Sequence, residues 1–571
     1  MNLATGFLFA WSLRSSLSTP ILEVSTDQWR ELNASVDGRL HIARPFALPC
    51  FSLYKNRSVP EDIEACSAIQ ANYTSPNFRL ESFSANMNVE YETCMSTHSQ
   101  CLLDTTDPTS PLATTGISCE QGEIPPYYID ISTASDVQEA FKFSKQTQVP
   151  LSIKNTGHDY MGRSRRQNSL GLWTHNLQAM SFHPQFVPEQ CGDLESQRAI
   201  TVGAGVTFEQ VYAFADDNDA MFVGAYAQSV GVSGGWVMGG GHSVLSPTLG
   251  LGVDRVLEIK LVTPDGKLRS ANECQNADLF WALRGGGGGT FGVVLESTHR
   301  VERRIPLQVI NMTFTPTSSN LREYFEILVN TSAEWAALGW GGHVNSAPAG
   351  IIYVNPRLSL AQATASMAQL SAFAKANDGT AVIETLPSWY DFFMKFIVEV
   401  EAPVGNLLAL GSRLIPKANF ESGEGRASLV AHLLAQTAAR GMPYIPVGTP
   451  ISFNYTPGTT SVTPAWRDAI WHLASGSSWP YNSTAAQTRG VLGSLHDFVH
   501  RNLTALAPNS GAYMNEGDVY ESDHEFSYWG PNYPRLLALK QKYDPEGLLD
   551  CWRCVGWKGA AEFPCYPKLD T

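Results

Sequence analysis

The sequence predicts an α+β protein of several domains in which glycine-rich loops connect short strands and helices. At about 150 residues per domain, 571 residues allow two to four units. Strand, helix and strand patterns occur at 127–154 and again at 199–223. Glycines then cluster at 229–252 and at 285–289. Beyond Arg304 the pattern changes to alternating strands and helices, which indicates a second domain.

The first pattern leads into a polar loop. Tyr127–Ile131 has the composition of a strand, and Thr133 with Asp136 forms a capping box at the start of a helix. Leu151–Lys154 is a second strand that runs directly into Asn155. In the second pattern, residues 199–202 form a strand, Thr207 caps a helix and 221–223 form a further strand.

Later segments are assigned by the same criteria. Strands are expected at 256–263, 291–296, 309–314, 351–354 and 451–454. Helices are expected at 277–283, 360–376, 464–474 and 533–543. The resulting organisation has five parts: a signal peptide at 1–19, a cysteine-rich extension at 20–119, a glycine-loop domain at 120–304, a second domain at 305–505 and a C-terminal segment at 506–571.

Several features favour the secretory pathway. The apolar stretch Leu3–Leu13 suits a signal peptide and is too short to span a membrane. Ten cysteines are compatible with disulfides, whose pairing the sequence leaves open. Cys551 and Cys554 are expected to be a structural disulfide or free thiols, because no further pair completes a metal site. Eight glycosylation sequons stand at Asn33, Asn56, Asn72, Asn311, Asn330, Asn454, Asn482 and Asn502.

The net charge of −15 argues against nucleic acid as a partner. The glycine clusters suggest a phosphate cradle, since backbone N–H groups surround an anion only where no Cβ intrudes. No cluster continues with Lys and Ser or Thr, which excludes a P-loop. The nearest Rossmann fingerprint, at Gly203 and Gly205, has Phe208 in place of the third glycine. Three separate loops, 155–163, 229–241 and 285–292, remain, and they suit a long ligand such as FAD.

These loops resemble those of the FAD-linked oxidases of the vanillyl-alcohol-oxidase superfamily, within them the fungal berberine-bridge-enzyme-like and isoamyl-alcohol-oxidase-like members. The resemblance rests on four segments: Ser152–Ser164 (SIKNTGHDYMGRS), Ser229–Ser243 (SVGVSGGWVMGGGHS), Asp278–Gly292 (DLFWALRGGGGGTFG), and Tyr513–Asn515 with Tyr528–Pro545. It implies a two-lobed FAD-binding domain of the PCMH type at 120–304, an α/β substrate domain at 305–505, and a C-terminal segment that returns to the FAD domain.

The resemblance also implies the site residues. His158 is expected to bond covalently to the flavin, and Ala227 stands where some relatives have a second, cysteine attachment, so a single tether is expected. Val230 matches the form associated with oxidases. The residues expected to bind FAD are Asn155, Thr156, Gly157, His158, Asp159, Gly162, Arg163, Ser229, Gly231, Gly234, Gly235, Gly239, Gly240, Gly241, His242 and Asn515. For His242 a purely structural role remains equally open.

The resemblance implies Tyr160 and Tyr513 as the catalytic residues, and for Tyr160 packing in the core remains open as an alternative. A proton acceptor is also needed, and Glu399, Glu401, Tyr353 and Tyr444 remain open as candidates. The predicted function is oxidation of an alcohol or a secondary-metabolite intermediate in a fungal pathway, with dioxygen as acceptor and hydrogen peroxide as product. Oxidation of a carbohydrate is an alternative, and so is a secreted binding protein without flavin. No metal is predicted.

Overall fold

The computed structural model describes residues 21–400 and 402–569, so the predicted signal peptide at 1–19 lies outside the described residues. The first lobe contains a four-stranded sheet with the order β1-β5-β7-β6. Strands β5 (Tyr127–Asp130), β7 (Leu170–Trp173) and β6 (Leu151–Lys154) are parallel, and β1 (Leu40–Ile42) pairs antiparallel with β5. The predicted helix is α4 (Ala134–Thr147), where the Asp136 carboxylate accepts from the Thr133 N–H at 2.8 Å.

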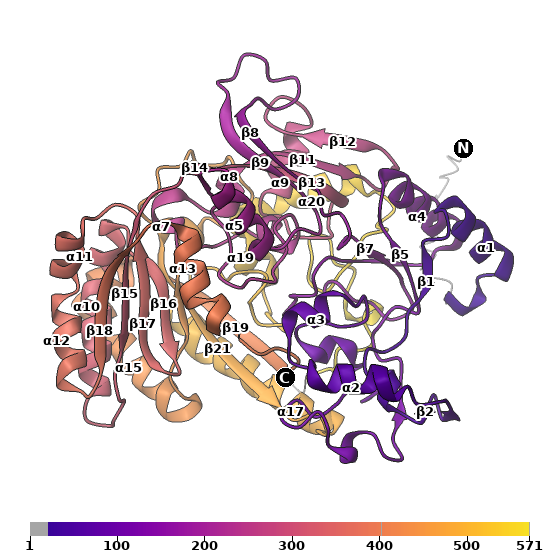
Figure 1. Cartoon of the computed structure of the whole chain (residues 1–571), viewed down its shortest axis with the longest axis horizontal. Coiled ribbons are helices and arrows are strands. Elements are labelled where there is room, and N and C mark those ends of the chain that lie inside the picture. The colour runs from indigo at the N-terminus through magenta and orange to yellow at the C-terminus, as the bar shows by residue number, and fades with distance from the viewer. Residues whose placement is uncertain (1–20, 401, 570–571) are drawn as a thin grey trace, which may run out of the picture.

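The second lobe is an antiparallel sheet with the order β12-β11-β13-β9-β8, seen at the top of Figure 1. Its strands are β8 (Met180–Phe186), β9 (Gln197–Gly203), β11 (Val256–Val262), β12 (Leu268–Ala271) and β13 (Val293–Arg300). Thr207 caps α5 (Phe208–Asp217) as predicted, with its N–H donated to Gln210 at 2.8 Å. The predicted helix at 277–283 is α9 (Ala277–Leu283).

The second domain is built on an antiparallel sheet with the order β18-β15-β17-β16-β20. Its strands are β15 (Leu307–Thr313), β16 (Gly341–Ser346), β17 (Ala349–Asn355), β18 (Thr380–Leu386) and β20 (Ile445–Val447). Helices α10 (Leu321–Leu338), α11 (Leu360–Ser366) and α12 (Ala368–Ala376) cover its outer side at the left of Figure 1. The predicted helix at 360–376 is thus divided at Met367.

Two predictions in this domain are wrong. Residues 464–474 are not a helix: one turn, α16 (Ala465–Asp468), is followed by strand β21 (Ala469–Trp479), which pairs with β19 (Leu407–Pro416). The apolar residues of β21 are buried, so tertiary pairing overrides the local helical pattern. Residues 451–454 form a loop rather than a strand, held by the Ser452 hydroxyl, which donates to the Ala336 carbonyl at 2.7 Å.

The extension 21–119 is fastened to the rest of the chain by one disulfide and is cross-linked internally by two others. All ten cysteines are paired, as Cys50–Cys66, Cys94–Cys565, Cys101–Cys119, Cys191–Cys274 and Cys551–Cys554. The Cys94–Cys565 bond joins the extension to the last residues of the chain. For Cys551 and Cys554 the sequence left open a disulfide or two free thiols, and the structure shows a disulfide.

The C-terminal segment returns to the glycine-loop domain and runs through the middle of the molecule in yellow (Figure 1). It contains α19 (His524–Trp529) and the predicted helix α20 (Tyr533–Tyr543). The Trp529 indole donates to the Gly285 carbonyl at 3.0 Å, and the buried Lys540 ammonium donates to the Thr290 carbonyl at 2.7 Å. This segment therefore buttresses the second glycine cluster. None of the described helices is both long and apolar enough to cross a membrane.

A buried ion pair lies at the centre of the extension, and we predict that it is a main source of its stability. The Arg79 guanidinium is fully buried, pairs with Glu92, and donates to the carbonyls of Asn86 at 2.7 Å and Tyr73 at 3.0 Å. Removing one partner leaves the other charged and buried, so Arg79→Ala is expected to cost about 3–5 kcal/mol in guanidinium unfolding. The exposed Arg30→Ala is the control, and equal effects of the two would contradict the prediction.

Candidate active site

The first polar loop begins where β6 ends. Lys154, the last residue of β6, is fully buried and its ammonium donates to the carbonyls of Ser82, Phe83 and Ala85 at 2.7, 3.0 and 2.6 Å. The extension therefore fixes the start of the loop. Thr156 and Gly157 are buried behind it, and the Gly157 carbonyl accepts from the Met87 N–H at 3.1 Å.

Asp159 and Arg163 determine the shape of this loop. The Asp159 carboxylate accepts from the Met161 N–H at 3.0 Å and from the Ser164 N–H and hydroxyl at 2.7 Å each. Arg163 donates to the carbonyls of Met514 at 2.7 Å and Trp552 at 3.0 Å. Both side chains were expected to bind FAD, and the structure gives them contacts that hold the loop and tie it to the C-terminal segment.

Gly162 has a φ of +73°, and a Cβ there would lie 2.1 Å from the Tyr566 hydroxyl oxygen. The loop thus requires glycine at this position, because an L side chain is strained at this φ and has no room.

His158 projects from the same loop onto the second one. Its Nε2 lies 2.7 Å from the Ser229 hydroxyl oxygen, and its ring is half-buried. Burial lowers the pKa of His158 to about 4, so the imidazole is neutral near pH 7. When Nε2 carries the proton and donates it to Ser229, the lone pair of Nδ1 is free to act as a nucleophile. The expected tether is therefore in the protonation state that bond formation requires.

The glycines of the second loop pack closely on neighbouring segments. A Cβ on Gly231 would lie 2.9 Å from the Asn155 side-chain oxygen, and one on Gly234 would lie 2.9 Å from the Asn155 amide nitrogen. A Cβ on Gly239 would lie 2.5 Å from the Asn515 amide nitrogen. Gly240 and Gly241 are also buried. The structure therefore brings the first loop, the second loop and the C-terminal segment together.

Gly235 differs from its neighbours. It is exposed although residues 231–234 and 236–241 are buried, and a Cβ there would meet nothing within 4 Å. Its carbonyl accepts from the Asn515 amide at 2.8 Å. The Asn155 side-chain oxygen is buried without a hydrogen-bond partner. The exposed backbone of Gly235 and the unpaired side-chain oxygen of Asn155 could both contact a polar ligand. They therefore fit a ligand such as FAD that lies across these loops.

The third glycine run contributes less than expected. Gly285 and Gly287 are buried, and Cβ atoms there would lie 2.2 Å from the Val462 nitrogen and 2.5 Å from the Met514 terminal methyl. A Cβ on Gly288 would lie 3.0 Å from the Gly235 Cα. Most of this run thus packs against protein, and only its end reaches the open backbone at Gly235.

Next to Asn515 lies a carboxylate between two imidazoles. A carboxylate oxygen of Glu516 lies 3.5 Å from His242 Nε2, and the other lies 3.7 Å from His472 Nδ1. Burial opposes ionisation of Glu516, but its contact with His242 and the nearby His472 and His343 lower its pKa below the usual value. Burial lowers the pKa of His472 to about 4. Near pH 7, Glu516 is therefore a carboxylate facing a neutral His472.

Among residues 21–400 and 402–569, His242, His472 and Glu516 form the group that can hold a metal ion, since their ligand atoms lie within 4.8 Å of one another. His242 thus has a defined place beside Glu516 and also contacts Tyr513 edge to face, with ring centroids 5.2 Å apart.

Both expected catalytic tyrosines border this cluster. Tyr513 is buried, and its hydroxyl accepts from the Asn515 amide at 2.8 Å. Tyr160 lies on the first loop, where its carbonyl accepts from the Tyr91 hydroxyl at 2.8 Å. Burial and the Glu516 charge raise the pKa of both phenols. They are therefore protonated near pH 7 and suit hydrogen-bond donation rather than proton abstraction.

Of the four proton acceptors considered from sequence, one lies at this cluster. The Tyr444 hydroxyl forms a 2.6 Å hydrogen bond with His343 Nδ1. Glu399 is exposed in a short helical turn, Tyr353 is buried in β17, and Glu401 lies outside the described residues.

Glu516, His343 and His472 were missed by the sequence reasoning. The two histidines lie singly on β16 and β21 and carry no motif. Glu516 directly follows the recognised Asn515, so that segment, extended by one residue, would have included it.

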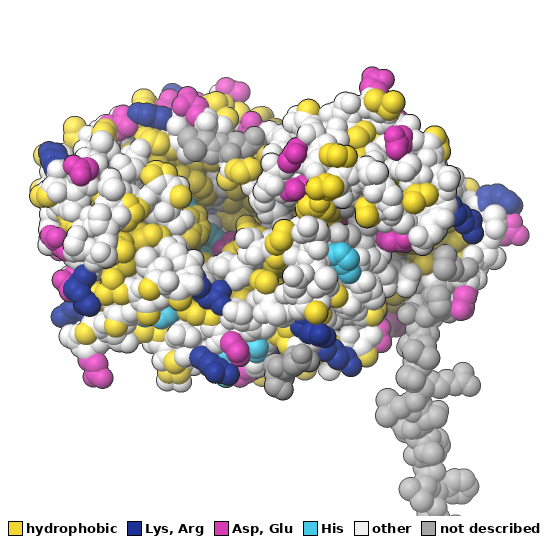
Figure 2. All heavy atoms as spheres, turned by 90° about the horizontal axis from the view of Figure 1, so that it is seen from below, with side chains coloured by type: hydrophobic (Ala, Val, Ile, Leu, Met, Phe, Trp, Pro, Cys, Tyr) yellow, Lys and Arg dark blue, Asp and Glu magenta, His cyan; other side chains and the backbone are white. Residues whose placement is uncertain are grey.

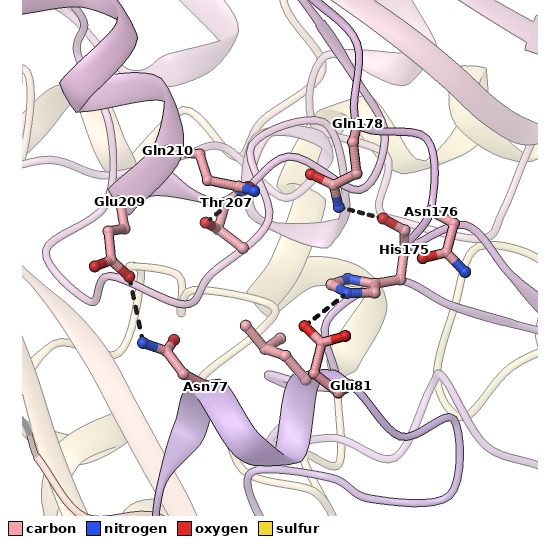
Figure 3. A pocket seen from close by; sticks show the side chains of 9 residues that line it. Asn77, Glu81, His175, Asn176, Gln178, Thr207, Glu209 and Gln210 are labelled. Atoms are coloured by element: carbon pink, nitrogen blue, oxygen red, sulfur yellow. Dashed lines mark hydrogen bonds and ion pairs between the residues drawn. The ribbon is translucent and has the colours of Figure 1, made fainter.

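Two surface cavities of the structure are lined by neither His158 nor Glu516. One of about 370 Å³ is bordered by α3 (Pro76–Leu80), the start of α5 and the loop at His175 (Figure 3). His175 stacks on Trp173, whose indole donates to the Asn155 carbonyl at 3.2 Å. This cavity therefore adjoins the back of the first loop. Figure 2 shows a separate hollow between the two sides of the molecule, with histidine and acidic side chains visible in it.

Gly235 provides a direct test of ligand binding at these loops. We predict that Gly235→Ala loses the bound ligand but keeps the melting temperature of the ligand-free wild type, because its Cβ meets no protein atom. The control is Gly490→Ala, at an exposed site on α17 (Ala485–Phe498) that also has nothing within 4 Å. Retention of ligand absorbance by Gly235→Ala would contradict the prediction.

Comparisons with known proteins identify the ligand. Residues 125–272 match the family described as FAD binding domain, and residues 512–550 match the family described as berberine and berberine like. The FAD-linked oxidoreductase ffsJ of Aspergillus flavipes is 42% identical over 94% of this chain and 93% of its own. The FAD-linked oxidoreductase cheF of Chaetomium globosum is 40% identical over 93% of this chain and 86% of its own.

Solved structures agree in fold. The VAO-type flavoprotein MtVAO615 of Myceliophthora thermophila C1 has a TM-score of 0.81 and 26% identity, over 93% of this chain and 95% of its own. A glucooligosaccharide oxidase of Acremonium strictum, described with 6-S-cysteinyl, 8α-N1-histidyl FAD, has a TM-score of 0.61 and 19% identity, over 76% and 92% of the chains. The expected resemblance is confirmed, and this chain belongs to the FAD-linked oxidoreductases with the VAO-type fold and a berberine-like C-terminal segment.

Proposed function

We propose that this FAD-linked oxidoreductase is an oxidase that acts on an alcohol or a secondary-metabolite intermediate of a fungal pathway and passes electrons to dioxygen, giving hydrogen peroxide. The observation that carries the proposal is the neutral His158 imidazole, held by Ser229 where three chain segments meet. When bound, FAD accepts the two electrons and the hydrogen of a substrate C–H bond.

We assign a single covalent attachment, through His158. Ala227, which stands in the place of a second attachment, is exposed and has no nucleophilic side chain. Val230 lies three residues further on and is half-buried. It matches the residue found at this position in related oxidases, which supports access of dioxygen to the flavin. Gly235, Asn155 and Asn515 would lie along the cofactor, since they carry the open backbone and polar groups of the cradle.

The domain roles follow from this assignment. Residues 120–304 bind FAD, residues 305–505 form the wall of the site that faces the substrate, and residues 506–571 complete the site. Tyr160 and Tyr513 donate hydrogen bonds to substrate, because their phenols stay protonated. The walls of the cluster are imidazole and phenol groups, which bind hydroxyl-bearing molecules through hydrogen bonds and ring contacts.

A panel of primary and secondary alcohols and of sugars, assayed for peroxide release, separates the main proposal from its alternative, a carbohydrate oxidase. Turnover of alcohols but not of sugars supports the first. Reduction of the flavin by substrate without peroxide formation would make the protein a dehydrogenase.

The attachment has its own test. We predict that His158→Ala leaves the flavin extractable by acid precipitation, whereas the wild type keeps it on the chain, because this imidazole meets Ser229 of the second loop as a neutral nucleophile. The matched control is His183→Ala, on the exposed strand β8, which should retain covalent flavin. Flavin that stays bound to the acid-precipitated His158→Ala chain would assign the tether to another residue.

We further propose secretion, which five disulfides support. Asn56, Asn330, Asn454, Asn482 and Asn502, among the sequons, are exposed. We predict that protein from a secreting fungal host loses mass on treatment with a peptide N-glycosidase, and that peptide mapping finds glycans at these exposed sites. An unchanged mass would contradict entry into the secretory pathway.

A further inference from the structure

The Glu516 cluster lies where three parts of the chain meet. His242 comes from the end of the second glycine loop, His343 and His472 from strands β16 and β21 of the second domain, and Glu516 from the C-terminal segment. Substrate sites of this kind form at domain junctions. Glu516 directly follows Asn515, whose amide reaches the open backbone of Gly235. The carboxylate therefore lies beside the expected cofactor position.

The cluster contains buried polar atoms without partners. His472 is only 1% exposed, yet neither of its ring nitrogens has a hydrogen-bond partner. His343 Nε2 is also buried and unpartnered. Such atoms are costly unless a ligand or water satisfies them. Glu516 itself keeps 22% of its side-chain surface accessible, so a small molecule can reach it.

We propose that Glu516 is the general base that accepts the proton of the substrate hydroxyl, and that His242 and His472 position it. This inference rests on the proposed oxidation of an alcohol. The substrate O–H bond breaks and its proton moves to a Glu516 oxygen. The O–H electron pair becomes the second bond of a carbonyl, while the adjacent C–H hydrogen leaves with its electron pair to FAD. The products are a carbonyl compound, reduced cofactor and protonated Glu516.

The surroundings decide which group is the base. The titratable groups that face Glu516 are His242, His343, His472, Tyr160, Tyr444 and Tyr513. The phenols are protonated near pH 7, because burial raises the pKa of each. His472 and His343 are neutral, with pKa values lowered by burial to about 4 and about 3. Glu516 is thus the anionic acceptor of the cluster.

The first test is anaerobic reduction of the bound flavin by the best alcohol of the panel, followed from pH 4 to 9. Glu516→Gln should slow reduction by about 10²- to 10⁴-fold, the usual contribution of a general base. Because Glu516 acts as a carboxylate, any fall of the wild-type rate at the acid end of this range should be absent from Glu516→Gln. Glu516→Asp should recover part of the rate.

The exposed Glu525→Gln is the matched control and should behave as the wild type. Covalent flavin content and melting temperature identify any variant that fails to fold. A Glu516→Gln variant that is folded and loaded but reduced at the wild-type rate would overturn the proposal.

The second test needs no turnover. Benzamidine, an aromatic cation without an oxidisable C–H next to nitrogen, pairs with carboxylates in two parallel hydrogen bonds. Calorimetry should give binding to the wild type that is at least about tenfold weaker in Glu516→Gln and unchanged in Glu525→Gln. If benzamidine bound equally to the wild type and both variants, or did not bind to the wild type, the proposal that Glu516 is an accessible anion would be wrong.

Two further results separate the alternatives. If benzamidine binds through Glu516 but no alcohol reduces the flavin, the proposed alcohol oxidation fails while the anionic acceptor site stands. Metal analysis of purified protein should give no stoichiometric metal. One equivalent of zinc or iron that is lost in Glu516→Gln would overturn the base and make the cluster a metal centre.

Discussion

The site depends on the contact between the first loop and the returning C-terminal segment. Arg163 donates to the Met514 carbonyl at 2.7 Å, and the next residue, Asn515, donates to the Gly235 carbonyl at 2.8 Å. The first bond joins residues 351 apart in sequence, and the second joins residues 280 apart. They hold the loop that carries His158 and the segment that carries Glu516 next to the exposed backbone of Gly235. Neither glycine loop alone would form a site with both groups.

The N-terminal extension supports the same contact from behind. It supplies the three carbonyls that hold Lys154 and, through Cys94–Cys565, it is joined to the end of the chain. Buried donor groups need hydrogen-bond partners: Lys154 donates to three carbonyls of the extension, and Arg79 pairs with Glu92 and donates to two further carbonyls. The extension is thus part of the scaffold of the flavin domain.

The sequence predicted well where local signals decide the structure. The capping boxes at Thr133 and Thr207 start α4 and α5, and α9 and α20 have their predicted bounds. It failed at β21, because a strand buried by pairing with a distant partner has no local signature. The His158 loop was found from its motif. The Glu516 cluster was not, since its members lie on four segments that only the tertiary fold brings together.

The central claim is that His158 carries the flavin, and mass spectrometry of the wild-type protein tests it most directly. Trypsin cleaves after Lys154 and Arg163, which releases residues 155–163 with His158 as the only histidine. The account predicts that this peptide carries the mass of one FAD, with fragment ions that assign the flavin to His158. An unmodified 155–163 peptide from yellow protein, or a flavin on any other peptide, would contradict it.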